Sequence, residues 1–222
     1  IADLRVRVIA FDERFQSTSS ASGPMTVLPG GWNVEDCNGN ATWDVCDIQS
    51  GASLDANTNL IPDECEYSIT RYCPGDGSGA PCPCGNTGAP GRGCANSAFS
   101  SGAALTASGG ASITGDTLVL AASGLTGTTA FFFQGTLELP PAIVDDGLGC
   151  VGGSLIRLGN RAIASGTSAY PGANDPLLHA RGLVPVYGGV RYYQCSYRNA
   201  APLFCPPSSS NRTNGVLVTW IP

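Results

Sequence analysis

A strict alternation of side-chain character marks the first residues of the chain. Residues 3–11 read DLRVRVIAF, with an apolar face and a mixed face at alternate positions. The apolar face carries Leu4, Val6, Val8 and Ala10, and the mixed face carries Arg5, Arg7, Ile9 and Phe11. A period of two with β-branched residues predicts a β-strand. Residues 16–34 are rich in Ser, Thr, Gly and Pro and show no such period, so we expect a strand unit over residues 1–15 followed by a linker.

Short apolar runs separated by turn residues fill the second half of the chain. They read ALTA, ASIT, TLVLAA, TAFFFQG, SLIRLG, VRYYQCSYR and GVLVTWI, with Gly, Ser, Asn or Pro between them. Seven or more short strands at this spacing predict an all-β fold, an antiparallel β-sandwich of the jelly-roll kind. We assign it to residues 67–222, which open with a disulfide-held collar up to Gly93. In GVLVTWI, Val216, Val218 and Trp220 share a face, whereas either face of VRYYQCSYR could point inward.

Composition narrows the class of protein. The 222 residues include 30 glycines and 16 prolines but only 13% charged residues, which disfavours long solvated helices. All eleven positive charges are arginines, and seventeen acids bring the net charge to −6. An acidic surface is a poor match for nucleic acid, and no run of 18 apolar residues is present. We therefore expect no nucleic-acid partner and no insertion into a membrane.

The cysteine content indicates an oxidising compartment. Ten cysteines in a chain with few charges are typical of a disulfide framework in an extracellular or cell-surface protein. We expect one bridge between Cys150 and Cys205, and two bridges within the group of Cys73, Cys82, Cys84 and Cys94. The same group of four could instead hold zinc. Its central pair is Cys-x-Cys rather than the Cys-x-x-Cys of common zinc sites, so we favour disulfides.

Residues 35–66 contain an internal repeat. DCNGNATWDVCD over residues 36–47 and DANTNLIPDECE over residues 55–66 share one twelve-residue pattern of oxygen ligands at positions 1, 3, 5, 9 and 12. With a backbone carbonyl at position 7, this is the pattern of an EF-hand-like calcium loop. We predict two calcium ions, one in each loop. The ligands are Asp36, Asn38, Asn40, Thr42, Asp44 and Asp47 in the first loop and Asp55, Asn57, Asn59, Ile61, Asp63 and Glu66 in the second.

Charge and loop details support the calcium prediction and qualify its type. Residues 35–66 carry eight of the seventeen acids and no arginine, so they are self-repelling without a cation. Position 6 holds Ala41 and Leu60 where EF-hands prefer glycine, which favours a dockerin-like or thrombospondin type 3-like loop. The low charge count and the extracellular setting suggest a calcium affinity of about 0.1–1 mM. The alternative is an acidic linker that binds nothing. Cys37, Cys46 and Cys65 occupy positions 2, 11 and 11, where a disulfide could clamp the loops together.

Candidate catalytic groups are few, and we expect no enzyme. His179 is the one histidine, and its apolar surroundings are more typical of a packed residue than of a general base. Asp145 and Asp146 could act with Glu138 as glycosidase carboxylates, but an Asp-Asp-Gly between apolar runs usually forms a turn.

Aromatic side chains and glycosylation sequons leave a sugar-related alternative open. Tyr192, Tyr193, Tyr197, Trp220 and residues 131–133 could stack on sugars, yet in a sandwich such residues usually fill the core. Asn211 and Asn40 each begin an Asn-x-Thr sequon, although Asn40 is already assigned as a ligand. Glycans are therefore candidate partners, either as ligands or as attached chains.

The order of these blocks resembles a family of secreted bacterial surface proteins. DCNGN…DVCD and IPDECE resemble their tandem calcium repeats, and YCPGDGSGAPCPCGNTGAPGRGCANS, DTLVLAASGL, FFFQG, DGLGCVGG, RYYQ, YRNA and TNGVLVTWIP resemble the uncharacterised Cys/Gly-rich β domain that follows them. The resemblance implies an extracellular location and this architecture, without an assigned reaction. Cys195 departs from the family pattern, where an apolar residue is usual, and this suggests an extra bridge, to a cysteine of the calcium repeats.

Some proteins of this layout resemble subunits of extracellular filaments, and the N-terminal strand supplies a mechanism. An amphipathic strand ahead of a long linker can add to the sheet of a neighbouring copy, and head-to-tail addition propagates into a fibre. We therefore predict an extracellular structural protein that polymerises through residues 3–11 and is rigidified by two calcium ions. The alternatives are a strand that pairs within its own sandwich, a carbohydrate-binding or adhesive module with calcium-ordered loops, and an extracellular hydrolase.

Overall fold

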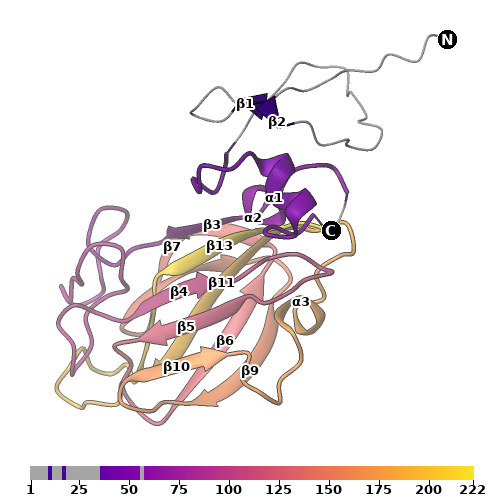
Figure 1. Cartoon of the computed structure of the whole chain (residues 1–222). Coiled ribbons are helices and arrows are strands. Elements are labelled where there is room, and N and C mark those ends of the chain that lie inside the picture. Colours follow the sequence, from indigo (N-terminus) through magenta and orange to yellow (C-terminus); the bar gives the residue numbers. More distant parts are fainter. Residues whose placement is uncertain (1–9, 12–16, 19–35, 56–57) are drawn as a thin grey trace. The chain divides into compact units, whose positions relative to one another are not determined.

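The computed structural model describes residues 10–11, 17–18, 36–55 and 58–222 (Figure 1). The chain divides into two compact units, Ile1–Val34 and Glu35–Pro222. In the first unit, strands β1 (Ala10–Phe11) and β2 (Ser17–Thr18) pair in antiparallel fashion, with Ala10 opposite Thr18. Residues 3–9, most of the predicted N-terminal strand, lie outside the described residues. Ser17–Thr18 lies within the predicted linker, and the rest of residues 16–34 lies outside the described residues.

The second unit is built almost entirely from antiparallel strand pairs. Its helices are short: α1 (Asp44–Ser50), α2 (Asp63–Glu66) and α3 (Leu178–Arg181). Its strands are β3 (Ser68–Tyr72), β4 (Ala104–Ser108), β5 (Val119–Ser123), β6 (Thr129–Gly135), β7 (Leu137–Val144), β8 (Gly147–Gly152), β9 (Ile156–Ala162), β10 (Thr167–Tyr170), β11 (Gly189–Arg198), β12 (Ser210–Arg212) and β13 (Gly215–Trp220). The all-β prediction is confirmed, whereas the jelly-roll form of a sandwich stays a prediction.

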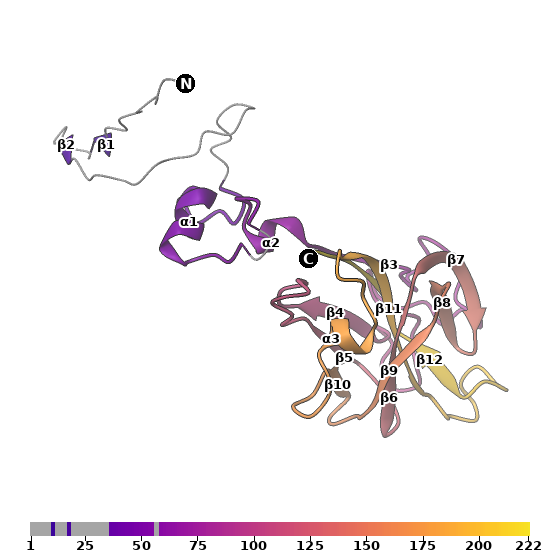
Figure 2. The same ribbon diagram turned by 90° about the vertical axis from the view of Figure 1, so that its right-hand side faces the viewer.

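The strands form three layers. The central sheet has the order β3-β13-β11-β6-β9, with β12 paired to the far end of β11. A three-stranded sheet, β10-β5-β4, lies on one side of it, and the β7-β8 hairpin lies on the other (Figure 2). The main core fills the space between the first two sheets, and its largest buried side chains are Trp220, Tyr170, Tyr193, Phe132, Leu105, Leu118, Leu120 and Leu178.

Strand β11 is buried on both faces from Tyr193 to Tyr197, which resolves the register left open by its sequence. Tyr193, Cys195 and Tyr197 point into the main core. On the opposite face, the Gln194 side-chain Nε2 donates to the backbone oxygens of Leu148 and Thr213 at 2.7 and 2.8 Å. Because the β7-β8 hairpin covers this second face, a polar residue there has backbone acceptors and no contact with water.

The disulfides differ from the predicted pairs. The structure has Cys37–Cys65, Cys73–Cys150, Cys82–Cys94 and Cys84–Cys205, and it leaves Cys46 and Cys195 as thiols. The Cys150–Cys205 prediction was therefore wrong, and one bridge rather than two forms within the group of four. The extra bridge expected for Cys195 is also absent, since that thiol is fully buried in the main core. Four disulfides indicate folding in an oxidising compartment.

Most of the candidate sugar-stacking aromatics belong to the interior. Phe132, Tyr193, Tyr197 and Trp220 lie in the main core, and the Trp220 Nε1–H donates to the Tyr193 hydroxyl at 2.9 Å. The Asn211 sequon is likewise inside the protein: its side chain is fully buried and its Nδ2 donates to the backbone oxygen of Ala95 at 2.9 Å. The folded protein has no room for a glycan on Asn211.

Candidate metal centre

The two twelve-residue loops adopt the same local structure, beginning with the aspartate at position 1. The Asp36 carboxylate accepts hydrogen bonds from the backbone N–H groups of Asn40 and Ala41, at 3.0 and 2.9 Å. The Asp55 carboxylate accepts from the equivalent Asn59 and Leu60, also at 3.0 and 2.9 Å. Each aspartate therefore folds its loop around one carboxylate. This confirms that the sequence repeat is a structural repeat.

Backbone conformation repeats as well, and it answers the question raised by position 6. Ala41 and Leu60 adopt left-handed φ values of 66° and 70°, and position 4 does the same with Gly39 at 71° and Thr58 at 60°. The left-handed conformation costs a non-glycine residue about 1–2 kcal/mol. The N–H groups of Ala41 and Leu60 each gain a bond to the position 1 carboxylate, which offsets part of that cost. The loops thus make the sharp turn of an EF-hand without its glycine.

The asparagine at position 5 lies across the loop from the acid at position 12. Asn40 Nδ2 donates to Asp47 Oδ2 at 2.9 Å, and Asn59 Nδ2 donates to Glu66 Oε1 at 2.6 Å. Position 3 joins the same cluster in the first loop, where Asn38 Nδ2 reaches Asp47 Oδ2 at 3.2 Å. Side chains from both ends of each loop therefore converge on one point.

The acids at position 9 begin the two helices. Asp44 is the first residue of α1 and Asp63 the first of α2, where a negative charge is favoured by the helix dipole. Both side chains are buried, as is Asp47. Among the described residues, Asp44 and Asp47 accept hydrogen bonds only from neutral amide groups, and no cationic side chain contacts either of them. Buried carboxylates without a cationic partner are costly, and a divalent ion would remove that cost.

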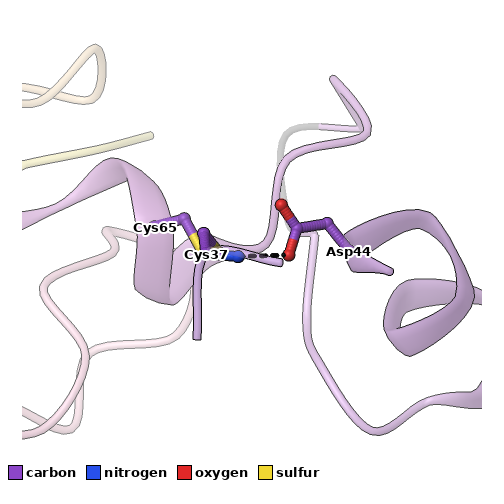
Figure 3. Close-up of side chains that lie close together, drawn as sticks. All are labelled: Cys37, Asp44 and Cys65. Carbon is purple, nitrogen blue, oxygen red and sulfur yellow. Dashed lines mark hydrogen bonds between the residues drawn. A yellow bond between two sulfur atoms is a disulfide. The ribbon is translucent and has the colours of Figure 1, made fainter. Parts of the chain in front are cut away.

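A disulfide ties the loops together. Cys37 at position 2 of the first loop bonds to Cys65 at position 11 of the second, and the Cys37 N–H donates to Asp44 Oδ1 at 2.9 Å (Figure 3). The two sulfurs and a carboxylate oxygen of Asp44 lie within 4.8 Å of one another. Because both sulfurs are already bonded to each other, they offer no thiolate to a metal. This cluster is a clamp, as the positions of the cysteines suggested.

Glu64 adds a second link between the loops that the sequence did not indicate. Its carboxylate accepts from the Ser53 hydroxyl and, at 3.3 Å, from Asn38 Nδ2 of the first loop. Burial acts to raise the pKa of Glu64, but the hydrogen bonds from Ser53, from its own backbone and from Asn38 outweigh it and hold the pKa below its usual value. Glu64 occupies position 10, which the calcium-loop pattern leaves unassigned, so no motif identifies it.

The donor set fits a hard cation. The side chains brought together are carboxylates and carboxamides, which are the ligands of Ca²⁺ in flexible loops, without a histidine or a thiolate. Of the predicted ligands, Asn38, Asn40 and Asp47 lie together in the first loop and Asn59 and Glu66 in the second. Asp36 and Asp55 hold the backbone of each loop, and Asp44 and Asp63 start the helices. Thr42 and Ile61 donate their N–H groups to Asn40 and Asn59. Asn57 lies outside the described residues.

The zinc alternative for the collar was wrong. All four cysteines are oxidised: Cys82 bonds to Cys94 within the group, whereas Cys73 and Cys84 bond to Cys150 and Cys205. Disulfide sulfur is not a zinc ligand.

The catalytic candidates lie on different elements, His179 in α3 and Asp145 and Asp146 between β7 and β8. His179 Nδ1 lies 2.9 Å from Asp116 Oδ2, which also accepts the His179 backbone N–H. In the described part of the chain, the ring of His179 has no hydrogen bond to a serine, threonine or cysteine that could act as a nucleophile. Asp145 and Asp146 form the tight turn between β7 and β8, as their sequence predicted. Asp146 is buried and accepts from Asn199 Nδ2 at 2.6 Å.

The two thiols are expected to differ sharply in reactivity. Cys46 is exposed on α1, whereas Cys195 is fully buried, and burial raises the pKa of the Cys195 thiol. A thiol reagent should therefore modify one cysteine in the folded protein and two after unfolding without reductant. Mass spectrometry of the modified peptides would identify Cys46 as the first. Modification of any other cysteine under native conditions would contradict these disulfide pairs.

Comparisons with known proteins give no relative for this chain. No protein-family model matches it, and neither curated proteins nor solved structures include a significant match. No helix in the described part of the chain is both long and apolar enough to cross a membrane.

Proposed function

We propose that this protein is an extracellular structural subunit that polymerises through its N-terminal strand and is rigidified by two calcium ions. The single observation that carries the proposal is the pair of equivalent loops, joined by Cys37–Cys65, which open the second unit and precede its first strand, β3, in sequence. A cation in each loop would fix a connector that has little apolar core of its own. Rigid connectors matter most in a protein that transmits force or geometry from one copy to the next.

Several features of the second unit support a structural role. Its four disulfides resist unfolding outside the cell. One cavity of about 480 Å³ is open to solvent, and its lining, which includes Leu155, Arg157, Pro176, Arg181 and Leu183, brings together no acid or nucleophile. An active site is usually a concave pocket with converging polar groups. The resemblance to secreted surface proteins with calcium repeats points the same way.

Electron microscopy of the full chain tests this proposal. In millimolar calcium we expect ordered fibres, and in a parallel sample treated with a chelator we expect the fibres to loosen or disappear, because the connector loses its cations. A matched sample with magnesium in place of calcium controls for ionic strength. Discrete, monodisperse particles in calcium would contradict the polymer and favour the carbohydrate-binding alternative. Fibres that stay unchanged after chelation would contradict the proposed role of calcium in the loops.

A further inference from the structure

The outer strands of the β-sheets are the places where another chain could pair, and most of them are closed. On β4, the N–H and C=O groups of Leu105 bond to the side chain of Asn214, at 2.8 and 3.0 Å. On β9, the backbone oxygen of Leu158 accepts from Arg181 Nε at 2.9 Å. Side chains therefore occupy backbone positions on both of these edges, which is a common protection against unwanted pairing.

Two further strands are closed by other means. Strand β7 contains Pro140 and Pro141, which have no N–H group, and its ladder with β8 is interrupted there. Strand β10 is tied at its first residue, because Thr167 exchanges backbone hydrogen bonds with Ala164, which lies between β9 and β10. Neither strand offers a continuous row of donors and acceptors.

Strand β3 carries no such protection among the described residues. It pairs with β13 from Tyr72 opposite Gly215 to Ser68 opposite Thr219, and in the described part of the chain no strand pairs with its other edge. Ser68, Thr70 and Arg71 are exposed. In an antiparallel pair, alternate residues point their N–H and C=O groups away from the partner, so the outer edge of β3 presents free backbone groups over five residues (Figure 1).

The main core also ends at β3. Tyr67 and Ile69 pack against it but remain partly exposed. A further strand beside β3 would cover both side chains if it carried apolar residues at alternate positions on the core side. Its other face would lie beside Ser68 and Thr70, in contact with water, and would have to be polar.

We propose that the outer edge of β3 accepts residues 3–11 of a second copy of this chain. This inference rests on the proposed polymer and names its acceptor. The apolar face with Val6 and Val8 matches the exposed margin of the core, and the face with Arg5 and Arg7 matches the solvated side. Residues 3–9 can pair with β3 while Ala10 and Phe11 keep their partners in β2. With this pair kept, the 17 residues between Thr18 and Asp36 span up to about 60 Å when extended, which is enough to reach a neighbour.

Disulfide trapping in the full chain tests the acceptor. All variants carry Cys46→Ser, which removes the exposed thiol. One chain then carries Arg5→Cys or Arg7→Cys, and a second, tagged chain carries Thr70→Cys, which shares the solvated face. Cysteines on adjacent strands reach the separation of about 5.5–6 Å between Cα atoms that a disulfide needs. The matched control replaces Thr70→Cys by Asn160→Cys, at an exposed position on the closed edge of β9.

The outcomes separate this inference from the proposed function. After mild oxidation of the mixed chains, we expect a covalent dimer with Thr70→Cys and none with Asn160→Cys. A crosslink within one monomer, formed when both cysteines are placed in the same chain, would show pairing in cis and overturn the inference. If the Cys46→Ser parent forms fibres but Thr70→Cys gives no crosslink, β3 is rejected as the acceptor and the polymer itself is not. Absence of fibres from that parent would reject the polymer itself.

Discussion

Removal of residues 1–15 is expected to convert the assembling protein into a folded monomer. The second unit, Glu35–Pro222, contains the whole main core and all four disulfides, so its stability does not depend on the removed residues. The removed residues hold the strand that we expect to join the copies. Sedimentation in millimolar calcium should change from large assemblies to a single species of monomer mass, and circular dichroism should keep the β-sheet signal.

Point variants in the same segment test whether assembly depends on the apolar face of the strand or only on the presence of an N-terminal extension. Val6→Asp with Val8→Asp places charges on the apolar face and should abolish assembly as completely as the deletion, because the acceptor would have to bury them. Arg5→Gln with Arg7→Gln changes the solvated face and should leave assembly intact. An unfolded product from the deletion, or assembly that survives it, would reject strand donation.

Local patterns could be predicted from the sequence with good accuracy. TAFFFQG coincides with β6, and the runs near Ala104, Val119 and Gly215 became β4, β5 and β13. The loop repeat was recognisable for the same reason, since all its candidate ligands lie within twelve residues of one another. ASIT was an error, because Ser112 forms only an isolated bridge to Ile221.

Features that depend on distant segments could not be predicted. The β7-β8 hairpin was missed because two prolines interrupt the alternation of apolar and polar residues in β7. Without the hairpin, nothing in the sequence predicts that both faces of β11 are buried. The disulfide errors have the same origin. Cys150 on β8 meets Cys73 just after β3, across 77 residues, and cysteine spacing does not reveal such a contact. The left-handed Ala41 and Leu60 run against residue preference and follow from hydrogen bonds to the position 1 carboxylates.

Single carboxylates should decide how many calcium ions bind. Asp47→Asn keeps the shape of the position 12 side chain but removes its charge, and we expect the stoichiometry measured by isothermal titration calorimetry to fall from two ions to one. Glu66→Gln should do the same in the second loop, and the double variant should bind none. Glu138→Gln, an exposed acid on β7 outside the loops, is the matched control and should keep two ions.

Binding of the same ions should also raise the free energy of unfolding. With an affinity of about 0.1–1 mM, raising calcium to roughly a hundred times the dissociation constant adds about 2.7 kcal/mol to the free energy of unfolding for each occupied site. Asp47 is buried and accepts hydrogen bonds from Asn38 and Asn40, so its replacement could also misfold the loop. Hydrogen exchange of residues 36–55 is therefore compared between the variant and the parent chain without calcium. Equal exchange without calcium shows that the variant has lost an ion and has not misfolded. Two ions bound to Asp47→Asn would show that the Asp47 carboxylate is not a required ligand, and calcium-independent exchange in the parent chain would show that the repeat folds without a metal. The carboxylates would then serve the backbone turns alone, as Asp36 and Asp55 already do.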